Sequence, residues 1–219
     1  MSKRLFDTLF AILCIFILSP LFVLIALLVK IGSPAGPVLY RSPRIGQWGN
    51  PFWVLKFRTM VINADRMGGP STADDDPRIT PIGHFLRKYK LDELPQLFNV
   101  LRGEMSFVGP RPEVPEYVAL LSERERAILS VPPGITDWAT LWNPDEGTVL
   151  AGCADPERAY LEIIRPRKIA LQLEYVKRHS FRIDLVILFR TVTVIAFRPA
   201  YRVMMALVRK VPAIGNELE

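Results

Sequence analysis

Two adjacent carboxylates, Asp92 and Glu93, lie in residues 80–112, where the chain has its densest set of side chains capable of chemistry. Asp92 precedes an apolar repeat of helical spacing, so it is expected at or beside a helix N-cap. Backbone N–H groups and the positive end of the helix dipole would keep its carboxylate ionised at neutral pH. An ionised carboxylate can act as a nucleophile without a separate base. The alternative is that Asp92 only caps the helix.

Three cations in two flanking segments could meet a diphosphate. Residues 52–60 (FWVLKFRTM) have the pattern of a strand, and an alternation of period two places Lys56 and Arg58 on one face. Residues 108–112 (VGPRP) hold Arg111 between two prolines, which restrict the backbone. Its guanidinium can therefore meet phosphate oxygens with little loss of conformational freedom. The alternative for each cation, taken singly, is a solvated surface.

The apolar repeats around the carboxylate pair predict two short helices. Thr80 and Pro81 form an N-cap and a first-turn proline, and the helix that they begin is expected over residues 81–90. A second helix follows, with Pro95 in its first turn and Gly103 as its stop signal. The apolar residues of this second helix recur at helical spacing: Leu94, Leu97, Phe98 and Leu101.

Upstream of these helices, the chain predicts a strand pair and a polar loop. Residues 38–41 and 52–57 are expected to pair around the turn signals at Gly46 and Gly49. Residues 63–76 are polar and contain glycine, which indicates a mobile loop. The acidic run at the end of this loop is expected to be solvated, with a metal site as the alternative: Asp74, Asp75 and Asp76.

Residues 5–29 are almost wholly apolar and long enough to cross a bilayer. Ser19 and Pro20 lie in the middle of this run, where a proline frees a backbone carbonyl, and Asp7 is expected at the membrane interface. Basic residues flank both ends, which favours two cytoplasmic ends: Lys3, Arg4, Lys30, Arg41 and Arg44. We therefore expect a re-entrant helix that breaks at Ser19-Pro20. A simple spanning anchor is the alternative, and a cleavable signal peptide is disfavoured because no cleavage site follows.

Length and composition indicate one compact domain with a membrane element. The chain has 219 residues, of which 50% are hydrophobic and 23% charged. The formal net charge of +6 favours an anionic partner such as a nucleotide or lipid headgroups. Cys14 and Cys153 are far apart and form no CxxC motif, which argues against a disulfide scaffold or a zinc site.

Three linked motifs resemble those of the bacterial sugar transferases, the monotopic polyprenol-phosphate phosphoglycosyl transferases. The motifs are KFRTM at 56–60, LDELPQL at 91–97 and MSFVGPRP at 105–112. Their order, spacing and flanks match, and the resemblance covers residues 3–198. In residues 133–142 (PGITDWATLW), Asp137 and Thr140 depart from the Gly and Gln that many members carry. This departure leaves the nucleotide and sugar contacts of that segment undefined.

The resemblance implies a two-step transfer of a phosphosugar from a UDP-sugar to a polyprenol phosphate, such as undecaprenyl phosphate. The aspartate attacks the sugar-side phosphate, which releases UMP and leaves a covalent aspartyl-phosphosugar, while the glutamate helps to hold Mg²⁺. These roles fall on Asp92 and Glu93, with Lys56, Arg58 and Arg111 as phosphate-binding residues. The reaction would initiate polysaccharide or glycoconjugate assembly at the cytoplasmic face of the bacterial inner membrane.

The fold class that these features predict is α+β, mostly helical, with a small antiparallel hairpin, a re-entrant membrane helix and interfacial amphipathic helices. Residues 1–32 form the membrane helix, 33–198 the catalytic domain and 199–219 a C-terminal amphipathic helix and tail. Residues 185–197 are apolar but too short to span, so they are expected in the membrane interface. Residues 201–210 suit a basic amphipathic helix, with a homodimer or core contact as the alternative.

Two other classes of function compete with the enzyme. A non-catalytic membrane-anchored scaffold would use Asp92 only as a helix cap. A basic nucleic-acid binder would account for the net charge, but the basic residues are not interleaved with an aromatic stacking platform. We therefore expect no nucleic-acid partner.

Overall fold

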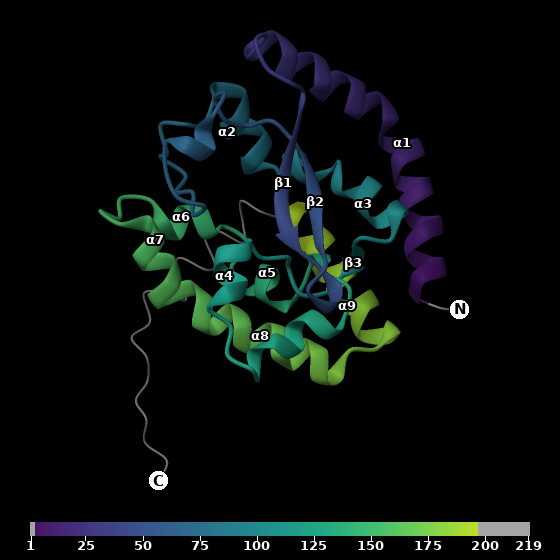
Figure 1. Cartoon of the computed structure of the whole chain (residues 1–219). Coiled ribbons are helices and arrows are strands. Elements are labelled where there is room, and N and C mark those ends of the chain that lie inside the picture. Colours follow the sequence, from purple (N-terminus) through teal and green to yellow (C-terminus); the bar gives the residue numbers. More distant parts are fainter. Residues whose placement is uncertain (1–2, 197–219) are drawn as a thin grey trace.

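The computed structural model describes residues 3–196, and it is mostly helical. The C-terminal amphipathic helix and tail expected over 199–219 lie outside these residues. Figure 1 shows the long helix α1 along one side of a body of short helices around the β1–β2 hairpin. In chain order the helices and strands are α1 (Lys3–Gly32), β1 (Leu39–Ile45), β2 (Pro51–Phe57), α2 (Pro81–Lys88), α3 (Gln96–Arg102), β3 (Ser106–Val108), α4 (Pro115–Ala119), β4 (Gly134–Thr136), α5 (Trp138–Trp142), α6 (Glu146–Leu150), α7 (Pro156–Ala159), α8 (Arg165–Arg178) and α9 (Phe181–Ala196). Tight or wide helical turns link them: η1 (Gln47–Gly49), η2 (Ala64–Arg66), η3 (Leu91–Glu93), η4 (Glu125–Ser130) and η5 (Tyr160–Ile164).

The antiparallel hairpin of β1 and β2 confirms the predicted strand pair. Leu39 pairs with Phe57 and Ile45 with Pro51, so the two strands match over their full length. The connection uses left-handed backbone at Trp48 (φ 60°) and Gly49 (φ 80°), which reverses the chain tightly. The hairpin therefore places Lys56 at the far end of β2, close to the helices that follow.

The two predicted helices around the carboxylate pair are present as α2 and α3. The Thr80 side chain accepts a hydrogen bond from the Gly83 N–H (3.0 Å), as expected of an N-cap. Gly103 ends α3 in the left-handed conformation (φ 85°). Asp92, however, is not the N-cap of α3. It lies in the separate turn η3, and Pro95 precedes the first helical residue.

A second sheet joins β3 to β4 in parallel, with Ser106 opposite Gly134 and Val108 opposite Thr136. The sequence predicted only the antiparallel hairpin, because strands of three residues are too short to show an alternating pattern. The backbones of Gly109 and Gly134 approach so closely that a side chain on either would meet the other segment. This contact brings the segment that holds Arg111 beside the one that holds Asp137.

Helix α1 has the length and composition of a membrane helix, with a mean hydropathy of 3.1 over its most apolar window. Pro20 lies inside it, and the helix continues through Ser19-Pro20 instead of breaking there. Pro20 cannot donate to the carbonyl of Phe16, and the Ser19 hydroxyl donates to that oxygen instead (2.8 Å). The predicted break at Ser19-Pro20 is therefore absent: α1 is one uninterrupted helix, and it changes direction along its length (Figure 1).

Both ends of α1 contact the rest of the fold. Near the start, Lys3 pairs with Asp184 of α9 (2.5 Å), and Arg4 donates to the last carbonyls of α3. Near the other end, Ile25 and Val29 are buried in a cluster with residues of β2 and α2. Asp7, which was expected at the membrane interface, is buried within the protein, where it accepts a hydrogen bond from the Phe107 N–H (3.4 Å). The middle of α1 is apolar and exposed, with Phe16 at 78%.

Helices α8 and α9 complete the body of the fold. Tyr175 of α8 and Ile187 of α9 are buried in the main core with residues of β2, α3 and β3. The predicted apolar stretch near the C-terminus is helical, and α9 keeps a row of exposed apolar side chains: Phe181, Leu185, Phe189 and Val192. This row lies on one face of the helix, as an interfacial helix requires.

Candidate active site

Asp92 and Glu93 lie in the short turn η3 between α2 and α3. The turn begins at Lys90, which has a left-handed backbone (φ 57°) and so redirects the chain after α2. Asp92 is buried, with 6% of its surface exposed, and its Oδ1 has no hydrogen-bond partner. A buried carboxylate oxygen without a donor is costly in free energy, so this atom is available to a ligand or a reacting group.

Glu93 is held by two cations from different parts of the chain. Lys56 Nζ lies 3.1 Å from Glu93 Oε1, and Arg111 Nη1 lies 3.1 Å from Oε2. Arg111 Nη2 also contacts Oε1, so the guanidinium meets the carboxylate with both terminal nitrogens. Two of the predicted phosphate-binding residues, Lys56 and Arg111, therefore contact Glu93, and Asp92 is its neighbour in the chain.

The surroundings of the pair shift the pKa values of the two carboxyl groups in opposite directions. Burial raises the pKa of Asp92, the charge of Glu93 raises it further, and Lys56, Arg87 and Lys90 oppose the rise. Burial also opposes ionisation of Glu93, but Arg111 and Lys56 outweigh it and lower the pKa well below the usual 4.5. The position expected for Asp92, at or beside the N-cap of α3, is wrong, because Pro95 occupies the N-cap and Asp92 lies in the turn before it.

The buried side chain of Asn99 joins β2 to α3, the helix that follows the turn with the carboxylate pair. Its Oδ1 accepts from the Leu55 N–H (3.0 Å), and its Nδ2 donates to the Trp53 carbonyl (2.7 Å). Both bonds join α3 to the strand that holds Lys56. The amide of Asn99 is fully buried, so these two bonds hold α3 against β2 in a low-dielectric environment.

Arg58 was expected beside Lys56, but its guanidinium lies elsewhere. The strand ends at Phe57, and Arg58 donates to the carbonyl of Ser33 in the loop that leaves α1. Gly36 packs so closely on the guanidinium that a side chain at this position would overlap it. Arg58 Nε and Nη1 are buried without partners. The structure therefore connects Arg58 to the membrane exit loop and Lys56 to the carboxylate pair.

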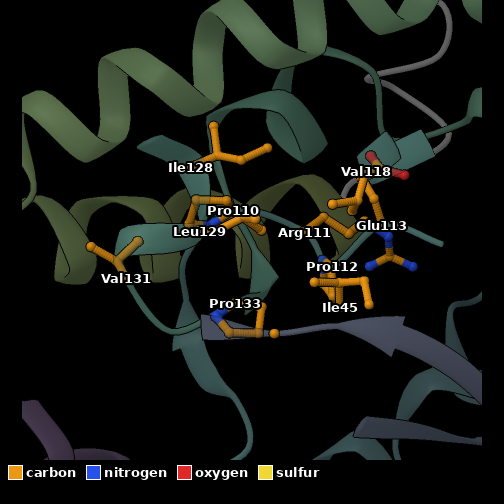
Figure 2. A pocket seen from close by; sticks show the side chains of 11 residues that line it. Ile45, Pro110, Arg111, Pro112, Glu113, Val118, Ile128, Leu129, Val131 and Pro133 are labelled. Atoms are coloured by element: carbon orange, nitrogen blue, oxygen red, sulfur yellow. The ribbon is translucent and has the colours of Figure 1, made fainter. Parts of the chain in front are cut away.

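Arg111 projects from a rigid segment with an apolar backing. Figure 2 shows it in the wall of a small cavity, with apolar side chains behind the segment and Glu113 beside it. The apolar members of this wall include Ile128, Val131 and Pro133.

Further charged residues near the site were missed by the sequence analysis. Glu146 of α6 is one of the carboxylates that raise the pKa of Arg111, and it pairs with the buried Lys168 (3.3 Å). Lys168 also pairs with Glu113 (2.8 Å). Only Glu113, two residues from Arg111, carried a positional signal in the sequence. The others come from helices more than thirty residues downstream of Arg111, and no local pattern connects them to it.

In the acidic run at 74–76, Asp74 and Asp75 are exposed, as expected of solvated side chains, and all three carboxylates also make contacts within the protein. Asp74 accepts from the Thr148 hydroxyl (2.6 Å), Asp75 from the Gly152 N–H (3.1 Å), and Asp76 pairs with Arg78 (2.6 Å). These bonds attach the loop to α6 and its surroundings. Among residues 3–196, no three His, Cys, Asp or Glu side chains are grouped to hold a metal ion.

Comparison with known proteins gives a consistent assignment. Residues 1–198 match the family described as bacterial sugar transferase. The chain is 41% identical over 206 residues to the exopolysaccharide production protein ExoY of Sinorhizobium fredii, covering 87% of this chain and 84% of that protein. It is 38% identical over 199 residues to the UDP-glucose:undecaprenyl-phosphate glucose-1-phosphate transferase of Escherichia coli, covering 87% of this chain and 39% of that protein. An undecaprenyl-phosphate glucose phosphotransferase of Komagataeibacter xylinus is 40% identical, with 88% of this chain and 35% of that protein covered.

Proposed function

Because this chain belongs to the bacterial sugar transferase family, we propose that it transfers a phosphosugar from a UDP-sugar to a polyprenol phosphate and releases UMP. The names of the relatives from Escherichia coli and Komagataeibacter xylinus support an undecaprenyl-phosphate acceptor. The chain spans little more than a third of the length of these two proteins, so their substrates are part of the proposal. The observation that carries it is the unpartnered, buried oxygen of Asp92 beside a Glu93 held by two cations.

The proposed reaction has two displacements at one phosphorus atom. An oxygen of Asp92 forms a bond to the sugar-side phosphorus, and the bond from this phosphorus to the bridging oxygen breaks, so UMP leaves with the electron pair. A phosphate oxygen of the polyprenol phosphate then attacks the same phosphorus and releases the Asp92 carboxylate. Lys56 and Arg111 supply positive charge where negative charge develops on the leaving nucleotide.

We infer that Mg²⁺ is a cofactor of the proposed reaction. Mg²⁺ is usually held by one or two protein carboxylates together with substrate phosphates, and it prefers oxygen ligands. Lys56 and Arg111 contact both oxygens of Glu93, so Mg²⁺ would have to replace one of these contacts for Glu93 to hold it. One oxygen of Asp92 would offer a second ligand while the other reacts. When bound, the ion would neutralise part of the charge of the diphosphate.

The membrane placement is also part of the proposal. Both ends of α1 contact the same folded body, and basic residues flank both ends, which supports a re-entrant helix. With its apolar middle in the bilayer, the active site would lie at the cytoplasmic face of the inner membrane. The exposed apolar row of α9 would lie in the interface of the same leaflet.

Donor-only incubation tests the covalent route. The purified protein is mixed with a panel of UDP-sugars and Mg²⁺ without polyprenol phosphate, and UMP is measured on a rapid time scale. We expect a burst of one UMP per active site and a phosphosugar mass on the peptide that contains Asp92. A matched sample with EDTA tests the metal.

The alternative mechanism is direct attack by the polyprenol phosphate on the bound donor. It requires both substrates before any UMP appears. Turnover with both substrates, but no phosphosugar on the Asp92 peptide with donor alone, would exclude the covalent route. Absence of UMP with every donor and acceptor would exclude the transferase proposal as a whole.

A further inference from the structure

The departure at Asp137 creates a buried carboxylate that contacts the segment of Arg111. Asp137 is fully buried, and both of its oxygens are used. Oδ1 accepts from the N–H (2.6 Å) and the hydroxyl (2.8 Å) of Thr140, so the two departing residues are partners. Oδ2 accepts from the backbone N–H of Arg111 (3.2 Å) and from Gln172 Nε2 (3.0 Å).

The hydrogen bond to Arg111 is important because of the two prolines around it. Pro110 and Pro112 have no N–H, so Arg111 provides the one backbone donor of this three-residue segment. Gln172 of α8 is fully buried and also reaches the Arg111 carbonyl (3.5 Å). The backbone of Arg111 is therefore contacted on its N–H side by Asp137 and on its carbonyl side by Gln172.

The side chain of Arg111 is guided by the same segment. Its Nη1 donates to the carbonyl of Ile135 (3.3 Å), two residues before Asp137, and the same nitrogen donates to Glu93 (3.1 Å). The end of β4 and the residue after it thus contact both the backbone and the guanidinium of Arg111, which pairs with Glu93.

We propose that Asp137 is a positioning residue, which acts through Arg111 to aim its guanidinium at Glu93 and at the phosphates of the donor. The effect of Asp137 on the reaction rests on the proposed function, whereas its contact with Arg111 does not. Asp137 also caps α5, so a purely structural role is the competing explanation. The cap of α5 uses Oδ1 and the contact with Arg111 uses Oδ2, so substitutions can test the two roles separately.

The variant Asp137→Asn retains the shape of the side chain but carries one acceptor oxygen and one NH₂ group. The amide oxygen is expected to keep the shorter bond to the Thr140 N–H (2.6 Å, against 3.2 Å to Arg111). The NH₂ group then faces the Arg111 N–H, and the bond to Arg111 is lost. Thr140→Val is the matched control, because it removes a donor to Oδ1, leaves the Thr140 backbone N–H and does not touch the Arg111 side. Both variants are prepared as full-length protein in nanodiscs.

Two measurements follow. Hydrogen exchange by mass spectrometry reports the Arg111 N–H without any substrate, because residues 110–112 contain no other exchangeable backbone amide. We expect fast exchange in Asp137→Asn and wild-type protection in Thr140→Val. In the UMP assay, kcat/KM of Asp137→Asn should fall at least about tenfold, as for other residues that orient a catalytic group, while Thr140→Val stays near wild type.

A double-mutant cycle gives the decisive comparison. In the background Arg111→Met, adding Asp137→Asn should cost little further activity, since its target is gone. Fully additive losses of activity in the double variant would overturn the positioning role. Equal losses of kcat/KM in Asp137→Asn and Thr140→Val, with the Arg111 amide still protected, would also overturn it. If the amide exchanges as expected but wild-type protein releases no UMP from any donor, the proposed function fails while the contact stands.

Discussion

Asp92 combines burial, an unpartnered oxygen and a negatively charged neighbour, and each of these raises the free energy of its ionised form. Its pKa is therefore raised above the usual 3.8. The folded state binds the proton of Asp92 more tightly than the unfolded state does, so its contribution to stability is present at low pH and lost as the pH rises through the folded pKa. An ionised Asp92 at neutral pH is maintained at a cost to stability, as is common for groups that react.

Asp92→Asn should separate activity from stability. Asparagine has nearly the same shape and no charge, so at pH 7 in EDTA the melting temperature should equal or exceed that of the wild type. UMP release should fall by at least about a thousandfold, since the amide cannot form the ester. Differential scanning fluorimetry and the UMP assay measure the two effects. Retained turnover with a lower melting temperature would instead support a capping or scaffold role.

The pH dependence of turnover should report the raised pKa of Asp92. A nucleophilic carboxylate is active when deprotonated, so kcat/KM should decrease on the acid side at a pH above 3.8, the usual aspartate value. Glu93 has a lowered pKa and stays ionised through this range, so it adds no second decrease there. Rates measured from neutral pH downward test this. A profile that remains flat to the usual aspartate value would contradict it.

At the scale of elements, β2 ends at Phe57, between Lys56 and Arg58. The alternating pattern of a longer strand would have placed these two cations on one face. Lys56 belongs to the strand and meets Glu93, whereas Arg58 follows the strand and contacts the exit loop of α1. Lys56→Met should therefore lower kcat/KM by about a hundredfold, the usual loss for one donor that stabilises transition-state charge. Arg58→Met should lower the melting temperature more than Lys56→Met does, and kcat/KM less.

These two substitutions are controls for each other, since both replace a cation of β2 or its end by an apolar chain of similar length. Steady-state kinetics and thermal unfolding are measured on both. An equal loss of kcat/KM in Arg58→Met, without loss of stability, would show that its unpartnered nitrogens reach the donor or the acceptor. That outcome would restore the original expectation for Arg58.

At the scale of the whole molecule, α1 contacts the folded body at both of its ends. A re-entrant helix places both ends in the cytoplasm, so single cysteines before residue 3 and near Lys30, in a background without Cys14 and Cys153, should resist labelling from the periplasm. A membrane-impermeant maleimide on intact cells measures this. Labelling of the N-terminal position from outside would show that α1 spans the bilayer.

Pro20→Ala tests the physical cause of this topology. Alanine restores an N–H that can donate to the Phe16 carbonyl, which the Ser19 hydroxyl otherwise satisfies. A straighter helix of 30 residues is long enough to cross the bilayer, so a fraction of the N-terminal position should become accessible from the periplasm. Ser19→Ala is the matched control, which keeps the proline. Unchanged protection in Pro20→Ala would mean that the contacts of Lys3 and Arg4 suffice to hold the end inside.

Local rules in the sequence determined the elements around the site. Thr80, Pro81 and Gly103 set the ends of α2 and α3 because caps and stops depend on neighbouring backbone groups alone. The alternating residues and turn glycines determined the hairpin, and the apolar run determined α1. The three motifs also identified the family, and with it the carboxylate pair and two of the cations that contact it.

Only the tertiary structure decided how these residues are arranged in space. The burial of Asp92, the diversion of Arg58 to Ser33, the parallel pair of β3 and β4, and the contact of Asp137 with Arg111 join segments that lie far apart in the chain. Such contacts depend on which surfaces pack together, and the side chain alone does not disclose its partner. The same aspartate type is an ionised cap in one environment and a buried, unpartnered carboxylate in another, because desolvation and neighbouring charges are properties of the fold.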